Sequence, residues 1–307
     1  MPDLSSLYRR GMLGITERTW VRRLFTEYPV GRRLATRFVA GEGLDDAVAV
    51  AGALNRSGIS VSMDHLGEHV YDAGSASEAL ADYMACLDQI EAEHLDANVS
   101  VKLTQLGLAV DPSIASDALA KLAKRAAAAG TTVTVDMEES IWTEATIELY
   151  EEIQPRFGNL GVAVQAYLHR TEDDLRRIMA LGGHIRLCKG AYVEPPEVAV
   201  QDKRQVDARF RHLLTMLMGE TATHPAIATH DNALISDTYA LARSRDGSFE
   251  FQMLYGVRPT LQQEILEKGY RLRIYVPYGS QWYPYLTRRM AERPANLALF
   301  LRAVVGK

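Results

Sequence analysis

Four side chains near the end of the chain share one face of a predicted helix. Tyr285, Arg288, Arg289 and Glu292 fall at positions i, i+3, i+4 and i+7 of the segment PYLTRRMAE, which places them on one stripe. Helices usually place apolar residues on such a stripe. Two adjacent guanidinium groups suit bidentate binding of a carboxylate or a phosphate, and Glu292 is spaced to pair with Arg288. The stripe therefore predicts either an anion-binding face or a solvated helix surface.

The elements that precede this helix favour the first interpretation. Eight β-rich runs alternate with helical patterns, and the runs are nearly continuous apolar segments, as in parallel strands buried on both faces. They cover residues 59–68, 98–107, 131–138, 160–170, 184–192, 225–231, 249–256 and 271–279. Eight such units predict a (β/α)8 barrel, with a doubly wound open sheet as the alternative. In a barrel, a helix that starts at Ser280 would lie over the mouth with its polar stripe facing inward.

Composition and charge limit the classes of function. The 307 residues are 47% hydrophobic and carry a net charge of −5, which argues against general nucleic-acid binding. Residues 1–40 contain eight arginines, no lysine and three acidic residues, so this segment is basic and the remainder acidic. We predict a helical arm at residues 1–57 and a barrel domain at residues 58–307.

The sequence also indicates where the protein works. Arg9 and Arg10 interrupt the first apolar run before it reaches the length of a secretory signal, and no apolar run is long enough to span a membrane. Two cysteines, Cys86 and Cys188, are too few for a disulfide scaffold. These features predict a cytoplasmic protein. We expect Cys188 to be a small buried residue within its strand.

Polar residues mark the carboxyl ends of almost all of the predicted strands. Barrel enzymes build their sites at these ends, and burying an unpaired charge costs several kcal/mol, so we expect these residues to converge on one ligand. They are Asp64, His65, Lys102, Asp136, Glu138, Gln165, His169, Arg186, Lys189, Thr229, His230, Asp231, Tyr255 and Tyr275.

Three local patterns suggest particular chemistries. The turn after RLCKGAY places Gly190 next to Lys189, where backbone amides can approach an anion. A metal site would use Asp64, His65, His169, His230 and Asp231, although no H-x-H or H-E-x-x-H pair occurs. Lys102 would act as the nucleophile of a Schiff-base barrel. No G-x-G-x-x-G fingerprint or P-loop is present.

Taken together, the segments RLCKGAY, ATHD, FEFQMLYG, RIYVPYG and PYLTRRMAERPAN resemble the proline dehydrogenase family. The resemblance runs from about Ser62 to Phe300. It implies a distorted (β/α)8 barrel with a helix over its mouth, bound FAD, and oxidation of L-proline to Δ1-pyrroline-5-carboxylate. It is closest to the monofunctional members of the family.

The resemblance also implies roles for individual residues. Asp136 and Arg186 match catalytic positions, with Arg186 near the flavin and Asp136 as the partner of Lys102. The substrate-binding positions are Lys102, Tyr275, Tyr285, Arg288, Arg289 and Glu292, where the two arginines hold the proline carboxylate. The cofactor-binding positions are Met137, Gln165, Arg186, Lys189, Gly190, Ala191, Tyr192, Thr229 and His230. Tyr192 also matches a tyrosine that packs near the proline ring.

The family passes electrons to a quinone, which implies contact with the periphery of a membrane. The arginine-rich helices of residues 8–37 are suited either to an anionic lipid surface or to packing on the barrel or on another subunit. Two other classes remain open: a metal- or Schiff-base-dependent barrel enzyme, which would be colourless, and a flavin- or amino-acid-binding barrel without turnover.

Overall fold

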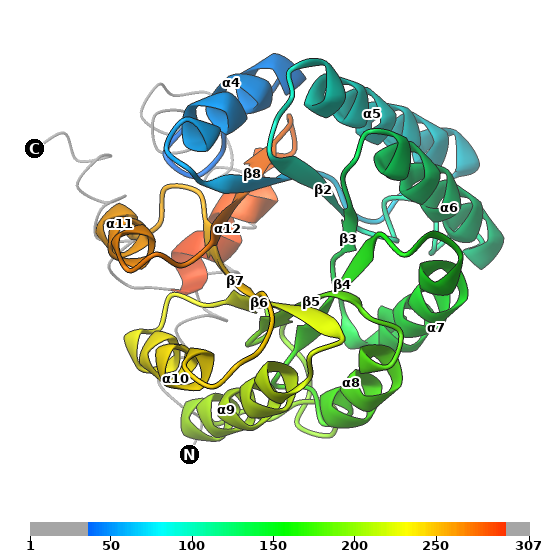
Figure 1. The fold of residues 1–307 in the computed structure, drawn as a ribbon. Coiled ribbons are helices and arrows are strands. Elements are labelled where there is room, and N and C mark those ends of the chain that lie inside the picture. The colour runs from blue at the N-terminus through cyan, green and yellow to red at the C-terminus, as the bar shows by residue number, and fades with distance from the viewer. Residues whose placement is uncertain (1–35, 293–307) are drawn as a thin grey trace, which may run out of the picture.

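The structure, a computed structural model, describes residues 36–292, with side chains described for residues 36–287. Eight parallel strands form a closed barrel in sequence order (Figure 1). They are β1 (Ser60–His65), β2 (Ala97–Val101), β3 (Val133–Val135), β4 (Leu160–Gln165), β5 (Gly183–Cys188), β6 (Thr223–Ala228), β7 (Glu250–Leu254) and β8 (Leu272–Tyr278). Pairing of β8 with β1, as between Ile274 and Val61, closes the sheet. The predicted barrel is confirmed and the open sheet is wrong.

Seven helices follow the first seven strands and surround the barrel (Figure 1). They are α5 (Ala73–Ala92), α6 (Pro112–Ala128), α7 (Ser140–Phe157), α8 (Thr171–Met179), α9 (Lys203–Gly219), α10 (Asn232–Ala242) and α11 (Pro259–Glu267). Aspartates cap four of them, because a carboxylate accepts hydrogen bonds from the first free amides of a helix. The caps are Asp72, Asp111, Asp202 and Asp231.

The outer ring is completed by a helix from before the first strand. Helix α4 (Leu44–Asn55) packs against β1 and β8, the place that a helix after β8 would take in a regular barrel. Its buried residues, Ala47 and Ala51, are small, which allows a close approach to the strands. A helix from before β1 thus occupies the position of the helix that would follow β8, and this is how the barrel departs from a regular (β/α)8 barrel.

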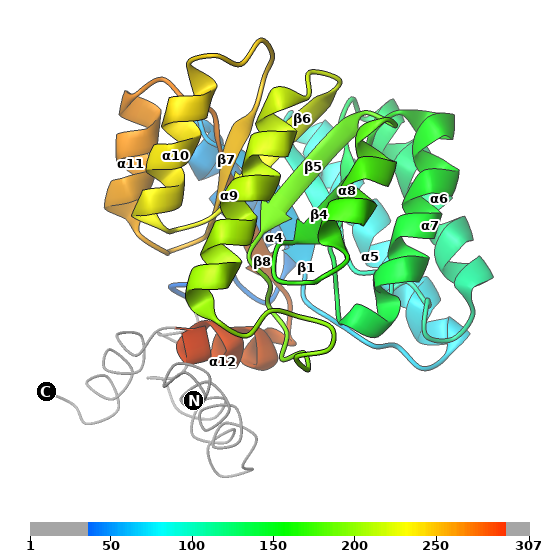
Figure 2. The ribbon, with the colours of Figure 1, turned by 90° about the horizontal axis from the view of Figure 1, so that it is seen from below.

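The helix after β8 lies instead across one end of the barrel, where Figure 2 shows it as α12 (Trp282–Glu292). Only Gly279, Ser280 and Gln281 separate it from β8, so it covers the carboxyl ends of the strands. The amide of Gly279 donates to the carbonyl of Gly41, and the indole of Trp282 donates to Glu42. The predicted helix over the mouth is confirmed. Most of the predicted arm, residues 1–35, lies outside the described residues.

The interior of the barrel is unusually polar. Barrel interiors are commonly filled by branched apolar residues, and here such residues face outward to the helices, as Val61, Val99 and Val133 do in the main core. The hydroxyl of Ser62 donates to Asn98 over 2.6 Å, and the amide of Asn98 donates to Thr134 over 3.0 Å. A hydrogen-bonded network therefore runs through the barrel and reaches the mouth.

Candidate active site

A cavity of about 470 Å³ opens at the carboxyl ends of the strands. This volume lies within the usual range of small-molecule pockets. Fourteen residues predicted from the sequence line it: Asp64, Lys102, Asp136, Met137, Arg186, Lys189, Gly190, Ala191, Tyr192, Thr229, His230, Asp231, Tyr275 and Tyr285. Tyr285 comes from α12, so this helix forms part of the cavity wall.

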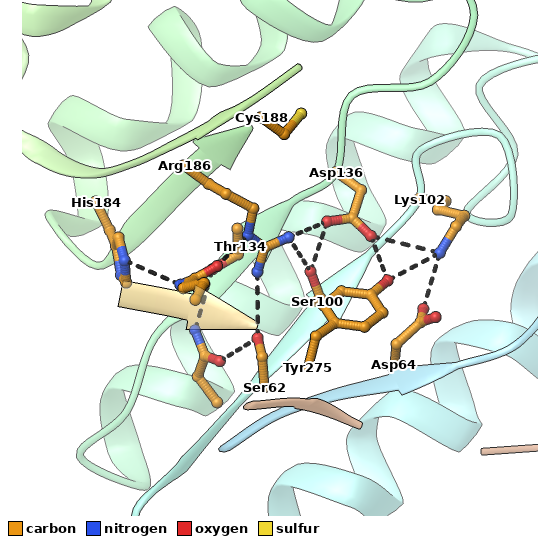
Figure 3. Close-up of polar contacts among 12 residues, drawn as sticks. Ser62, Asp64, Ser100, Lys102, Thr134, Asp136, His184, Arg186, Cys188 and Tyr275 are labelled. Carbon is orange, nitrogen blue, oxygen red and sulfur yellow. Dashed lines mark hydrogen bonds and ion pairs between the residues drawn. The ribbon is translucent and has the colours of Figure 1, made fainter. Parts of the chain in front are cut away.

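A cluster of buried ionic groups forms one wall of the cavity. The ammonium of Lys102 lies 2.8 Å from the Oδ1 atom of Asp64 and 3.4 Å from the Oδ2 atom of Asp136. The hydroxyl of Tyr275 donates to Asp136 over 2.7 Å. The expected pair of Lys102 and Asp136 is present, and Asp64, which the sequence did not assign to Lys102, is the closer partner (Figure 3).

Arg186 joins the same cluster from the opposite side (Figure 3). Its guanidinium bonds to Asp136, and it also donates to Ser100 over 3.0 Å, to Ser62 over 3.3 Å and, through Nε, to Gln252 over 2.5 Å. The guanidinium carbon lies 5.3 Å from the centre of the Tyr275 ring. These contacts hold a cation in a fixed place beside the cavity.

Electrostatics determine the protonation states in the cluster. Burial alone would lower the pKa of Lys102, but the charges of Asp64 and Asp136 raise it well above its usual value. Burial likewise opposes ionisation of Asp136, yet Arg186 and Lys102 hold its pKa below the ordinary range. A Schiff-base lysine must lose its proton to attack a carbonyl, so an ammonium held by two carboxylates disfavours that alternative.

Asp64 has an oxygen available to a ligand. Its Oδ2 atom is buried and lacks a hydrogen-bond partner, whereas Oδ1 accepts from Lys102. Burial is the main influence on Asp64 and raises its pKa, against the charge of Lys102. An unsatisfied buried carboxylate oxygen is costly. Since Asp64 also lines the cavity, this atom marks a place where a cationic group of a ligand would be stabilised.

The turn after β5 is held by its own contacts. The ammonium of Lys189 pairs with Asp207 and lies 2.9 Å from Asp231. Gly190 has a φ of +133°, and a Cβ atom there would lie 2.3 Å from the ring of Tyr167, so no other residue fits.

Cys188 is only half buried and lines the cavity, so the expectation of a buried filler is wrong. Burial still raises the pKa of its thiol to about 12.

Gln165 stands just behind the cavity wall. It does not line the cavity, but its Oε1 atom accepts from the amide of Ala191 over 3.0 Å. Its Nε2 atom donates to the carbonyl of Glu138 over 2.9 Å. Gln165 thereby connects the turn after β5 to the end of β3.

Not all of the polar strand ends converge, which corrects the expectation of a single ligand site. His65, Glu138, His169 and Tyr255 do not line the cavity. Successive residues of a strand point to opposite faces, so Asp64 faces inward while His65 packs against Tyr83 and Tyr278.

The alternative metal site is also wrong. Within residues 36–292, no three of Asp64, His65, His169, His230 and Asp231 bring their ligand atoms together. His169 lies on the surface, where its Nε2 atom contacts the carbonyl of Pro196. The described part of the chain contains one candidate group of metal ligands, at the opposite end of the barrel.

The side chains of Arg288, Arg289 and Glu292 lie outside the described residues. Their backbone belongs to α12, the helix that covers the mouth. The predicted carboxylate clamp therefore remains a prediction.

Three polar residues that hydrogen-bond to Arg186 were not predicted from the sequence. They are Ser62, Ser100 and Gln252. Each lies on the inner face of its strand, and Ser62 and Ser100 stand two residues before Asp64 and Lys102. Because strand faces repeat every two residues, this spacing was the signal that could have identified the two serines.

Glu138 gives a pH-dependent prediction. It accepts hydrogen bonds from the amide and hydroxyl of Thr104, but burial outweighs them and raises its pKa from an ordinary 4.5 to about 7. Because the folded-state pKa is the higher one, the stabilisation from the bound proton is complete below the unfolded-state pKa. It is lost as pH rises through about 7.

We therefore expect Glu138→Gln to gain stability relative to the parent as pH rises from about 5 to about 8, by on the order of 3 kcal/mol. Urea unfolding of both proteins across this range measures the difference. Glu148→Gln, on the exposed face of α7, is the matched control. Parallel stability curves for the parent and Glu138→Gln would show that Glu138 is ionised in the folded protein.

The closed barrel, with ionic residues and a cavity at the carboxyl ends of its strands, defines the class of barrel enzymes. The family model described as Proline dehydrogenase matches residues 47–300. The chain is 39% identical over 281 residues to proline dehydrogenase 1 of Bacillus subtilis subsp. natto, which covers 90% of this chain and 93% of that protein. It is 34% identical over 310 residues to proline dehydrogenase of Deinococcus radiodurans, and the match covers 98% of this chain and 99% of that protein. The chain belongs to the proline dehydrogenase family and is an oxidoreductase.

Solved structures share the fold. Proline utilization A (PutA) from Bdellovibrio bacteriovorus superposes with a TM-score of 0.81 at 24% identity, over 89% of this chain and 34% of that one. A bifunctional PutA protein superposes with a TM-score of 0.75 at 25% identity, over 90% of this chain and 32% of that one. The chain thus spans about a third of these longer proteins. Among residues 36–292, no helix combines the length and apolar character needed to cross a membrane.

Proposed function

We propose that this chain oxidises L-proline to Δ1-pyrroline-5-carboxylate with bound FAD and passes the electrons to a quinone. The observation that supports this most directly is the buried ionic cluster of Asp64, Lys102, Asp136 and Arg186 in the cavity wall. It occurs in a chain whose family membership is shown over most of its length.

The cluster suits a small zwitterion. Two carboxylates and two cations leave the cluster close to neutral, and the free Oδ2 atom of Asp64 offers an acceptor for the ammonium of proline. Lys102 and the arginine pair Arg288 and Arg289 supply positive charge for the carboxylate. Tyr275 and Tyr285 line the same cavity and provide aromatic walls for the apolar ring.

The residues around the cavity also fit a flavin. Cationic Arg186 and Lys189, polar Thr229 and His230, and the ring of Tyr192 lie together along its wall, as a polar ring system with phosphates requires. We assign cofactor contacts to Met137, Arg186, Lys189, Gly190, Ala191, Tyr192, Thr229 and His230, and we assign Gln165 to the same cofactor site from behind the wall, where it holds the amide of Ala191. When bound, FAD would supply the hydride acceptor, which no amino-acid side chain provides.

The protein's own part is to orient the substrate and to hold fixed charges near it. Lys102 is fixed by Asp64 and Asp136, and Arg186 is fixed by Asp136, Ser100 and Gln252. Preorganised charges of this kind stabilise charge that develops during a reaction without reorganisation. Glu292, spaced to pair with Arg288, would neutralise part of the clamp before proline binds.

The quinone acceptor implies contact with the surface of a membrane from the cytoplasmic side. The basic segment of residues 1–40 is the candidate for this contact, since anionic lipid attracts clustered arginines.

Two measurements on the purified chain test the proposed function. Denaturation should release a flavin that mass spectrometry identifies as FAD, and L-proline should drive reduction of an artificial electron acceptor. A chain that releases no flavin, or that binds FAD but reduces no acceptor with proline, would contradict the proposal.

Arg289→Met should lower kcat/KM for proline by at least about 10-fold while FAD stays bound. Loss of a charge-assisted pair typically costs about 1.5–3 kcal/mol, and a misplaced substrate also reacts more slowly. Steady-state kinetics and the flavin content of the variant measure both parts. Parent-like kinetics would place Arg289 on a solvated helix surface.

A further inference from the structure

Three potential metal ligands meet at the amino-terminal ends of β5, β6 and β7, opposite the cavity. They are His184, His224 and Glu250, one from each of three neighbouring strands. His184 and His224 are paired across β5 and β6. Their ligand atoms and those of Glu250 all lie within 4.8 Å of one another, which no other group of three or more such residues achieves in the described part of the chain.

The distances suit a shared ion. The Nε2 atom of His184 lies 3.2 Å from Oε1 of Glu250, and the Nε2 atom of His224 lies 3.8 Å from Oε2. Ligand atoms about 2.0–2.1 Å from a tetrahedral zinc ion are separated by roughly 3.3 Å. The two imidazole rings stand nearly perpendicular, at 85°, with centres 4.9 Å apart. Small side-chain movements would therefore bring all three ligands to one ion.

Further contacts orient these side chains in the way that outer partners orient metal ligands. The Nδ1 atom of His224 lies 2.8 Å from the hydroxyl of Ser248, which leaves Nε2 facing Glu250. Arg273 and Gln252 donate to the Oε1 atom of Glu250 over 2.8 and 2.7 Å. Both donors act on the same oxygen, so the Oε2 atom remains on the side of His224. The amide of Gln252 also lies 3.4 Å from Nε2 of His184 and would turn away from it when an ion binds.

The exposure of the three side chains and the chemistry of their ligand atoms indicate how an ion would enter and which kind of ion would bind. The side chain of His224 is 25% exposed, whereas those of His184 and Glu250 are 10% and 1% exposed, so an ion would enter past His224. Imidazole ligands select zinc and its neighbours over magnesium or calcium, which prefer oxygen. Arg273 already balances the charge of Glu250, which limits the affinity without blocking Oε2.

We propose that His184, His224 and Glu250 form a binding site for a divalent transition-metal ion of the zinc type. The ion would join the starts of three strands and stabilise the barrel, and water would complete its coordination. This site lies at the other end of the barrel from the proposed proline site, and the proposal does not rest on that function, although Gln252 contacts both Arg186 and Glu250.

The test uses the full chain without a polyhistidine tag and with its cofactor retained, titrated with Zn²⁺ in a calorimeter. We expect saturable binding of one ion per chain and a melting temperature that rises with Zn²⁺ concentration, as mass action requires. His224→Gln should weaken binding at least about 10-fold, since even the loss of an outer partner typically costs 10–100-fold. It should also abolish the thermal shift.

His212→Gln provides the matched control, because His212 forms a surface pair with Glu172 at 3.0 Å and should leave zinc binding unchanged. Anomalous scattering from zinc-soaked crystals should locate the ion between the two Nε2 atoms and Glu250. Because His224 is partly exposed, its variant should fold even if a substitution of buried His184 does not. Absence of saturable binding, parent-like binding by His224→Gln, or an ion found only at other histidines would overturn the proposal.

Discussion

Lys102→Met should lower kcat/KM for proline by roughly 10²–10⁴-fold. Lys102 is the nearest cation to Asp64 and the second cation of Asp136, so its removal leaves two buried carboxylates close together with only Arg186 to balance them. Breaking a buried ion pair in this way typically costs about 3–5 kcal/mol, which spans that range at about 1.36 kcal/mol per tenfold. Steady-state kinetics and urea unfolding of the variant measure the cost in activity and in stability.

Two further variants separate the lysine's charge from its contact with substrate. Asp64→Asn combined with Lys102→Met should recover stability, because one of the two carboxylates is gone, but it should not recover activity. Lys121→Met, on the exposed face of α6, should behave like the parent. If Lys102→Met alone kept both its stability and its kinetics, the ion pairs would have no part in the fold or the reaction.

Arg186→Met should slow proline oxidation and lower the reduction potential of the bound flavin. Arg186 is buried beside the cavity, and its guanidinium is fixed by Asp136, Ser100 and Gln252. A fixed cation in a dry site stabilises negative charge that develops nearby, and removal of one such donor typically costs 10²–10³ in kcat. Potentiometric titration and rapid-reaction kinetics measure the two effects separately.

Arg186→Lys retains the charge without the bidentate geometry and should fall between the parent and Arg186→Met in both measurements. Arg211→Met, which disrupts a surface pair with Asp237, is the control. A parent-like potential together with a parent-like reduction rate in Arg186→Met would remove Arg186 from the mechanism.

The architecture was predictable because parallel barrel strands leave a clear signal. Strands buried on both faces read as apolar runs, and each of the eight predicted runs overlaps an observed strand. The run of residues 131–138 gives the shortest strand, Val133–Val135. Asp136 and Met137 follow directly and line the cavity, and the amide of Asp136 still donates to the carbonyl of Val101 over 2.8 Å.

The position of α4 could not be predicted from its own residues. Its alanine-rich pattern indicates a helix, but its place beside β1 and β8 follows from α12 having moved over the mouth. The positions of α4 and α12 depend on each other, and these two helices lie far apart in the sequence.

The sequence predicted which residues form the candidate site better than it predicted which of them contact each other. Lys102 and Asp136 do meet, but Asp64 is the closer partner of Lys102, because only the barrel brings β1 next to β2. Strand alternation explains why His65 is not in the cavity although its neighbour Asp64 is. The group of His184, His224 and Glu250 was missed because their three runs are separated by helices in the sequence.

An anaerobic visible spectrum of the purified chain, recorded before and after addition of L-proline, tests directly whether the chain is a flavin-dependent proline dehydrogenase. We expect a yellow protein whose flavin absorbance bleaches with L-proline and stays unchanged with glycine, which lacks the ring. A colourless protein, or a yellow protein whose spectrum L-proline leaves unchanged, would contradict it.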